Sequence, residues 1–254
     1  MNLLVVYPGR FHPFHLGHKA SYDYLVNKYS ADSVYIATSD VQAPGTSPFS
    51  YSDKVAMMTK LGIPASHIAR VKNPYQVKEL VDNLPEPQNT ALIFAVSEKD
   101  MAGDGARFKF GTKKNGEPSY MQPMPENLKQ LEPLTKHAYL EVTPTVNFKV
   151  RGADANSASE IRNMYVKGSD ADRDQIITDL YGTYYPELRD IFDDKLGVAA
   201  KQEVDTAAPA LQERRDQLLI KINEMREQLA QFRQLNLTEE KIVDYIDEKK
   251  TRKI

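Results

Sequence analysis

Short apolar runs alternate with amphipathic stretches through the first two-thirds of this chain, and that alternation limits the fold more than any other feature. Most runs are too apolar to leave one face in water, and Gly, Pro, Asn or Ser bounds them, so we expect buried strands of a parallel sheet. The expected strands are Leu3–Tyr7, Val34–Thr38, Ile68–Lys72, Ala91–Val96 and Ala138–Val142. The helices expected between them are Gly17–Tyr29, Tyr51–Leu61 and Tyr75–Leu84.

Strands and helices that alternate with short connections predict the α/β class. We expect a Rossmann-like, doubly wound parallel sheet of five strands with an α-helical C-terminal extension. Ligands bind such sheets beyond the carboxyl ends of the strands, where the strand order reverses. After the last strand, a capping box of Ser157 and Glu160 opens a helix that ends near Val166. Two more helices are expected at Asp170–Tyr181 and Pro186–Leu196.

The chain is expected to divide into three parts. Residues 1–196 form the α/β domain, with an aperiodic loop insertion at 101–133; residues 197–209 form a linker; residues 210–254 form a helical, coiled-coil tail. In the tail, apolar residues repeat at three and four positions, the spacing of a coiled-coil seam: Leu218, Ile222, Met225, Leu229 and Phe232. This seam fits a helical hairpin on the chain's own domain and a homo-oligomer equally well.

Composition argues against several classes of protein. Apolar residues make up 41% of the chain and charged residues 27%, as in globular rather than disordered proteins. The 33 basic and 35 acidic residues leave a net charge of −2, which argues against a general binder of nucleic acid or of an anionic membrane. The chain has no cysteine, and neither a leader nor a membrane span is visible in it. We therefore expect a cytoplasmic protein.

The segment Gly9–His18, with the sequence GRFHPFHLGH, directly follows the first expected strand. A strand that breaks at Pro8 and leads into a helix with His15 and His18 is suited to holding phosphate. Glycine lets an anion approach the backbone, a helix N-terminus presents unpaired N–H groups, and imidazoles three residues apart share one face. Nucleotidyl transfer needs such groups, because the protein must bring two anions together and stabilise charge on the α-phosphate.

The stretch His15-Leu16-Gly17-His18 resembles the HxGH motif of the nucleotidylyltransferase superfamily, the cytidylyltransferase-like domain. A later motif of that superfamily, ISGTEIR or ISSTxxR, is similar to residues 156–162, with Asn156 and Ala158 departing from it. The resemblance spans about residues 2–167 and is closest to archaeal-type nicotinamide mononucleotide (NMN) adenylyltransferases. That family has a basic residue after an NPF motif, where this chain has Lys54 after Ser47-Pro48-Phe49.

The resemblance implies roles for residues in all three motifs. His15 and His18 would contact the triphosphate, with His18 as the transition-state donor, and Arg162 would hold the β- and γ-phosphates. These three are the expected catalytic residues. The expected nucleotide- and phosphate-binding residues are Gly9, Arg10, Phe11, Gly17, Lys54, Ser157 and Ser159. Mg²⁺ would bridge phosphates and water, so no protein ligand to a metal is expected.

The implied activity transfers a nucleoside monophosphate, AMP rather than CMP, from a nucleoside triphosphate to a small phosphorylated acceptor, with release of pyrophosphate. One such acceptor is NMN, which would give NAD. Members of the archaeal-type family commonly stack nicotinamide on Trp, which this chain lacks, so one of its 14 Tyr or 9 Phe residues would have to serve.

Other readings of the sequence remain open. One is a cytidylyltransferase that uses CTP, and another is a non-catalytic nucleotide-binding scaffold that acts in assembly through its tail. The basic run 109–114 is either a lid over phosphates or a solvated loop. Together with the HxGH turn, this run also resembles motifs of class I aminoacyl-tRNA synthetases, but a further strand follows it, which is the wrong order for that family.

Overall fold

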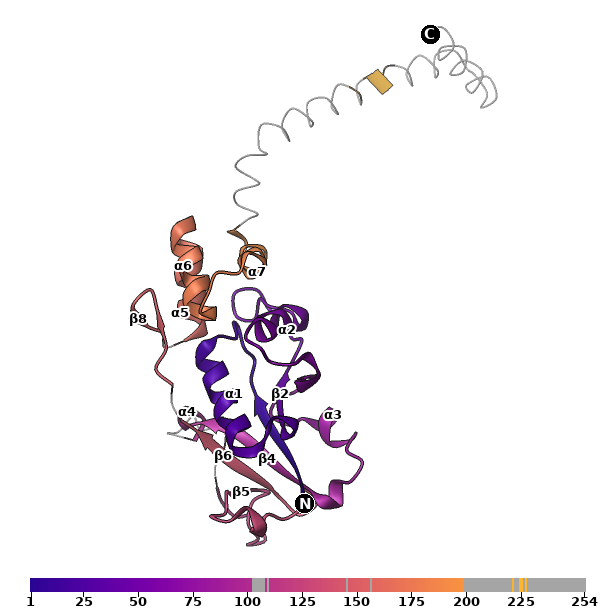
Figure 1. The fold of residues 1–254 in the computed structure, drawn as a ribbon. Coiled ribbons are helices and arrows are strands. Elements are labelled where there is room, and N and C mark those ends of the chain that lie inside the picture. The colour runs from indigo at the N-terminus through magenta and orange to yellow at the C-terminus, as the bar shows by residue number, and fades with distance from the viewer. Residues whose placement is uncertain are drawn as a thin grey trace, which may run out of the picture. The chain divides into compact units, whose positions relative to one another are not determined.

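The computed structural model describes residues 1–101, 108, 110–144, 146–155 and 157–198, together with 221, 224, 225 and 227 (Figure 1). The chain forms two compact units, residues 1–198 and 199–254. The four described residues of the second unit are helical and exposed. The rest of the expected linker and tail lies outside the described residues, so the three-part division and the coiled coil stay predictions.

A parallel sheet of six strands lies at the centre of the described part of the first unit (Figure 1). The strand order is β3-β2-β1-β4-β6-β5, and each neighbouring pair is parallel. The strands are β1 (Asn2–Pro8), β2 (Val34–Thr38), β3 (Ile68–Arg70), β4 (Thr90–Ser97), β5 (Met121–Pro123) and β6 (Ala138–Thr143). The α/β class and the parallel sheet are thus confirmed.

Within this sheet, the strand that the sequence does not predict is β5, which makes the sheet six-stranded instead of five-stranded. It lies within the expected loop insertion, pairs Gln122 with Tyr139 of β6, and forms one edge of the sheet. Its last residue, Pro123, has no N–H to donate, which an edge strand tolerates. Three residues are too few for a recognisable alternation, so this strand depends on its pairing with β6.

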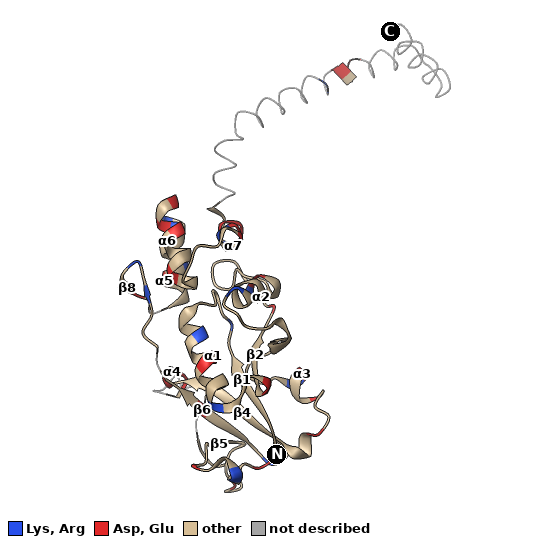
Figure 2. Ribbon diagram, in the orientation of Figure 1, with Lys and Arg blue, Asp and Glu red and all other residues tan. Residues whose placement is uncertain are grey.

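Alternate residues of β1 enter two hydrophobic clusters on opposite faces of the sheet. Val5 packs in the cluster that includes Leu25 and Phe192, whereas Leu4 and Val6 pack in the other cluster. Burying an aliphatic side chain of this kind stabilises a fold by about 1.5–3 kcal/mol. The central strands β1, β2 and β4 contain no charged residue, and the Lys, Arg, Asp and Glu residues gather on the helices and loops (Figure 2). The sheet therefore lies between two apolar clusters, one on each face.

Most helices contribute to the cluster that contains Val5. The helices are α1 (Leu16–Tyr29), α2 (Tyr51–Lys60), α3 (Lys78–Val81), α4 (Glu98–Met101), α5 (Ala158–Lys167), α6 (Asp170–Tyr181) and α7 (Pro186–Leu196), and a small hairpin of β7 (Lys149–Val150) and β8 (Ala153–Asp154) precedes α5. Among the described residues, none of the helices combines the length and the apolar character that crossing a membrane requires.

Helix α3 is much shorter than the helix expected at Tyr75–Leu84. The Asn73 side chain accepts a hydrogen bond from the Tyr75 N–H (3.0 Å), which favours a turn there. Val77 then adopts a left-handed backbone with φ of 41°, so the helix begins only at Lys78. Its apolar residues Leu80 and Val81 still pack on the sheet face that lies opposite Val5.

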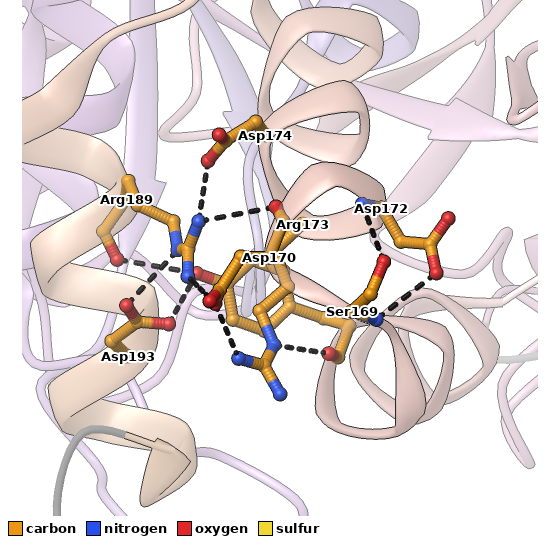
Figure 3. Close-up of polar contacts among 8 residues, drawn as sticks. Ser169, Asp170, Asp172, Arg173, Asp174, Arg189 and Asp193 are labelled. Carbon is orange, nitrogen blue, oxygen red and sulfur yellow. Dashed lines mark hydrogen bonds and ion pairs between the residues drawn. The ribbon is translucent and has the colours of Figure 1, made fainter. Parts of the chain in front are cut away.

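Helices α5, α6 and α7 are joined by the Arg189 cluster, which consists of Arg189, Asp170, Asp174, Asp193 and Tyr165. Figure 3 shows the arginine among the three carboxylates. The Arg189 guanidinium contacts Asp170 of α6 (2.9 Å), Asp174 of α6 and Asp193 of α7 (3.0 Å). The Tyr165 hydroxyl of α5 donates to Asp193 (2.7 Å). Only 11% of the Arg189 side chain is exposed. The cluster fixes α5, the helix that carries Arg162, against the two helices that follow it.

Candidate active site

A cavity of about 390 Å³ opens beyond the carboxyl ends of β1, β4 and β6. Its wall includes the turn after β1, the first two turns of α1, and the loop after β6. The strand order reverses at β1, which has β2 on one side and β4 on the other. The cavity therefore lies at the switch point where open α/β sheets bind ligands, and its size suits a small molecule.

The cavity collects part of the predicted site. The predicted residues on its described wall are Gly9, Arg10, Phe11, His15, Gly17 and His18. The other four, which are Lys54, Ser157, Ser159 and Arg162, do not belong to that wall. The structure thus brings the residues of the first motif together on one wall, and the residues of the later motifs do not line it.

The turn between β1 and α1 is shaped by Gly9 and Phe11. The Gly9 N–H donates to the Ala37 carbonyl oxygen (3.0 Å), and a Cβ at Gly9 would lie 2.4 Å from the Phe11 ring. Phe11 has a φ of 48° and packs edge-on against Phe14 and His18, each at 5.1 Å between ring centroids. This left-handed backbone is rare for a bulky residue, and the burial of the Phe11 ring offsets its strain.

His15 is the N-cap of α1, with an extended backbone (φ −154°). Its Nδ1 accepts a hydrogen bond from the Gly17 N–H (3.1 Å), so the proton of the neutral ring sits on Nε2. Burial, followed by the neighbouring His18, holds the pKa of His15 well below its ordinary value of 6.5. His15 is therefore a neutral imidazole with one N–H available to a ligand.

His18 lies on the first turn of α1 directly beside His15, with 3.9 Å between the ring centroids. Burial lowers the pKa of His18 to about 4. Its Nδ1 is buried and has no hydrogen-bond partner among the described residues, which leaves Nε2 as the nitrogen that a ligand can reach. Two neutral imidazoles thus lie side by side at the wall of the cavity.

Arg162 reaches back from α5 to the turn that carries the histidines. Its Nη1 donates to the His12 carbonyl oxygen (2.6 Å) and its Nη2 to the Gly45 carbonyl oxygen (2.9 Å). The guanidinium thus contacts the turn that carries the histidines, and its role toward phosphate stays a prediction. Two of its nitrogens are nevertheless engaged with backbone oxygens instead of pointing into the cavity.

Three cations surround the His12 imidazole. Burial, followed by the charges of Lys54, Arg162 and Arg10, lowers the pKa of His12 to about 3. Lys54 is fully buried, which lowers the pKa of its ammonium to about 8, and its Nζ donates to the Ser39 carbonyl oxygen (2.7 Å). The turn therefore carries excess positive charge, and an anion bound beside it would gain from that field.

Ser157 and Ser159 lie at the N-terminus of α5. Ser157 is the N-cap of this helix, as predicted, because its hydroxyl accepts a hydrogen bond from the Glu160 N–H (3.2 Å). Ser159 is exposed, with its hydroxyl 3.4 Å from that of Ser157. Asn156, the first residue of this predicted motif, lies outside the described residues.

Several residues of the cavity wall are absent from the predicted site, among them Tyr7, Tyr75 and Phe148. Tyr7 lies at the carboxyl end of β1, which is the position that the fold rule itself favours for ligand contacts. Burial raises the pKa of Tyr7 well above its ordinary value, so its phenol stays protonated. Phe148 lies in the loop after β6, where no sequence pattern distinguishes it.

The residues of the cavity fit a metal ion carried by the substrate better than one held by the protein. Among the described residues, no group of three or more His, Asp or Glu side chains could hold a metal ion. The carboxylate on the described wall is Asp100, which accepts hydrogen bonds from the Ser97 N–H (3.1 Å) and hydroxyl (2.8 Å). Phosphate oxygens and water would have to supply most of the ligands to Mg²⁺.

Part of the chain is similar to a curated enzyme. The chain is 34% identical over 55 residues to nicotinamide-nucleotide adenylyltransferase of Sulfurisphaera tokodaii. The chain resembles an HxGH nucleotidylyltransferase. The matched segment covers 22% of this chain and 32% of that relative, so the chain spans about a third of the relative's length. No protein-family model matches the chain.

Solved structures of adenylyltransferases are also similar to this chain. A bifunctional NMN adenylyltransferase/ADP ribose pyrophosphatase from Francisella tularensis has a TM-score of 0.46 and 16% identity, over 86% of this chain and 57% of that one. Nicotinic acid mononucleotide adenylyltransferase from Plasmodium falciparum, complexed with NaAD, has a TM-score of 0.42 and 16% identity, over 75% of this chain and 94% of that one.

Proposed function

We propose that this protein is a nucleotidylyltransferase. It transfers a nucleoside monophosphate from a nucleoside triphosphate to a small phosphorylated acceptor and releases pyrophosphate. AMP is the favoured group and NMN a favoured acceptor. The observation that carries this proposal is the gathering of Gly9, Arg10, Gly17 and the two imidazoles on one cavity wall at the N-terminus of α1.

The proposed chemistry is in-line attack of an acceptor oxygen on the α-phosphorus, with pyrophosphate as the leaving group. The N-terminus of α1 offers its unpaired N–H groups and the positive end of its dipole to the phosphates. The Nε2–H of His15 and the Nε2 of His18 donate to α-phosphate oxygens as charge develops there. Arg10 adds a full positive charge on the same wall. This arrangement stabilises the transition state by hydrogen bonds from groups that are already in place.

Mg²⁺ would enter with the triphosphate and neutralise part of its charge. Asp100 is the described carboxylate able to contact it from the cavity wall. Arg162 and Lys54 support the site from behind the turn, where their charges raise the positive potential felt by the β- and γ-phosphates. In this proposal, Ser157 and Ser159 bind phosphate at the N-terminus of α5, where Ser157 is the N-cap and Ser159 lies in the first turn.

Adenylyl transfer is favoured over cytidylyl transfer because the curated relative, similar over 55 residues, is a nicotinamide-nucleotide adenylyltransferase. For the acceptor, Tyr7 and Tyr75 provide aromatic surfaces on the cavity wall in a chain that has no Trp. Either ring is able to receive a nicotinamide by stacking.

The test is the release of pyrophosphate from ATP or CTP in the presence of Mg²⁺ and candidate acceptors: NMN, nicotinic acid mononucleotide and phosphopantetheine. We expect ATP with a mononucleotide acceptor to give both pyrophosphate and the adenylylated product. Turnover of CTP alone would correct the choice of base. If no pairing releases pyrophosphate and neither nucleotide raises the melting temperature, the proposed function is wrong.

A further inference from the structure

The imidazole of His15 is held between two rings. Phe148 stacks on it with 4.5 Å between the ring centroids and 11° between the planes, and His18 lies 3.9 Å away at 37°. Phe148 comes from the loop after β6, far from His15 in the sequence. The two rings and the Gly17 N–H together restrict rotation of the imidazole about its side-chain bonds.

The space for this stack depends on Gly17. A Cβ at Gly17 would lie 2.9 Å from His15 Cε1, 3.0 Å from His15 Nδ1 and 3.3 Å from Phe148 Cβ. Such distances are shorter than carbon atoms tolerate, so the glycine of the HxGH motif permits the contact of Phe148 with His15. The three residues therefore form one packed unit, which lies on the cavity wall.

We propose that Phe148 is a positioning residue, whose ring fixes the orientation of His15 so that its Nε2–H points at the α-phosphate. This inference rests on the proposed nucleotidyl transfer. An imidazole that flips would exchange Nε2 for a carbon atom and lose both the Gly17 hydrogen bond and the donor. An error of about 1 Å in such a donor is enough to slow a reaction by roughly a hundredfold.

Phe148 also keeps one face of the His15 ring away from water, which favours the neutral form. The titratable group that faces His15 from α1 is His18, itself neutral near pH 7 because burial lowers its pKa to about 4. On the loop side, Phe148 is uncharged and the neighbouring Lys149 is exposed. The charged residues elsewhere on the described cavity wall are Arg10, on the turn after β1, and Asp100, in α4.

The experiment compares Phe148→Ala and Phe148→Tyr with the wild-type protein. For Phe148→Ala we expect kcat to fall roughly tenfold to a hundredfold, while KM for the nucleotide changes less than about threefold, because only the transition-state contact is lost. Phe148→Tyr keeps the flat face and should restore kcat to within about threefold of wild type. Equal kcat in the Ala variant, or no rescue by Tyr, would overturn the proposal.

A second measurement does not depend on turnover. Titration of the His15 imidazole by NMR should show its pKa rising toward 6.5 in Phe148→Ala and staying low in Phe148→Tyr. The matched control is Tyr35→Leu, which removes a similar stack on His67 (5.0 Å, 5°) outside the cavity and should leave both kcat and the His15 titration unchanged. An unmoved His15 titration in Phe148→Ala contradicts the inference. If the His15 pKa shifts in Phe148→Ala but the wild-type protein transfers no nucleotide, the role of Phe148 in packing His15 is supported and the proposed function is wrong.

Discussion

At residue 17, helix propensity favours Ala, whereas local packing requires Gly. It lies in the first turn of α1, where Ala is intrinsically favoured over Gly by about 1 kcal/mol. In this structure, however, the added methyl group would collide with His15 and Phe148. The identity of residue 17 is therefore set by the cavity wall and not by the helix.

Gly17→Ala should lower kcat roughly a hundredfold, because His15 must move to make room for the new methyl group. Gly111→Ala is the control, since a Cβ at Gly111 meets no atom of the described residues within 4 Å. Steady-state kinetics measure kcat of both variants, and thermal melts confirm that both are folded. Unchanged turnover in Gly17→Ala would mean that His15 and Phe148 are not held as the structure has them.

His18→Ala tests the assigned transition-state donor. Losing one donor to developing charge in a dry site typically reduces kcat by about a hundredfold to a thousandfold, whereas affinity for the nucleotide should fall only modestly. Nucleotide affinity by calorimetry and kcat by pyrophosphate release separate the two effects. His137→Ala, outside the described cavity wall, serves as control. Equal kcat in the His18 variant would remove the catalytic assignment.

The buried histidines also predict how stability depends on pH. The pKa of His18 is about 4 in the folded protein and 6.5 in an ordinary exposed imidazole, so between these values the unfolded chain binds more protons. Stability should therefore fall as the pH drops from about 6.5 to 4, by up to about 3 kcal/mol for this residue. Urea unfolding at several pH values should show a shallower decline in His18→Gln. Parallel curves for the two proteins would contradict the burial of His18.

At the scale of elements, the Arg189 cluster makes α5, α6 and α7 one unit and so positions Arg162. Two of its carboxylates, Asp170 and Asp174, are 66% and 47% exposed, but Asp193 and Arg189 are only 15% and 11% exposed. Solvent screens the pairs of Arg189 with Asp170 and Asp174. Removing Arg189 from its pair with Asp193 would instead leave a mostly buried carboxylate without its counter-charge.

Arg189→Met should lower the free energy of unfolding by roughly 2 kcal/mol, since Asp193 loses its cationic partner in a poorly solvated position and, among the described residues, keeps only the hydrogen bond from Tyr165. Lys60→Met is the matched control, because Lys60 also joins α7 to another helix, through Glu187, but this pair is exposed and should contribute less than about 1 kcal/mol. Chemical denaturation measures both variants. Equal losses would show that burial does not set the strength of these pairs.

The elements also show what could and could not be predicted from the sequence. The β1 pattern and the i, i+3 spacing of His15 and His18 are local, so both the strand and the adjacency of the rings follow from a few residues. By contrast, β5 exists through pairing with β6, and Phe148 stacks on a ring from the other end of the domain. The acceptors of Arg162 are backbone oxygens, which every residue carries. Contacts of these kinds leave no recognisable pattern in the sequence, so they could not be predicted from it.

At the scale of the whole molecule, all the described residues of the cavity wall belong to the first unit, residues 1–198. A chain truncated after Val198 should therefore keep kcat within about threefold of the full-length value, because no described contact of the site is removed. Light scattering of both forms tests the proposed role of the tail in self-association. Loss of turnover in a folded, truncated chain would instead assign the tail a part in the reaction.

The bond between Arg162 and the His12 carbonyl joins positions 150 residues apart. A ribosome that has just released the histidine turn has yet to translate the helix that anchors it. The nascent protein therefore passes through most of its synthesis before the turn after β1 can gain this bond. Under the proposed function, nucleotide would therefore meet the completed turn only after α5 has been synthesised and packed against it.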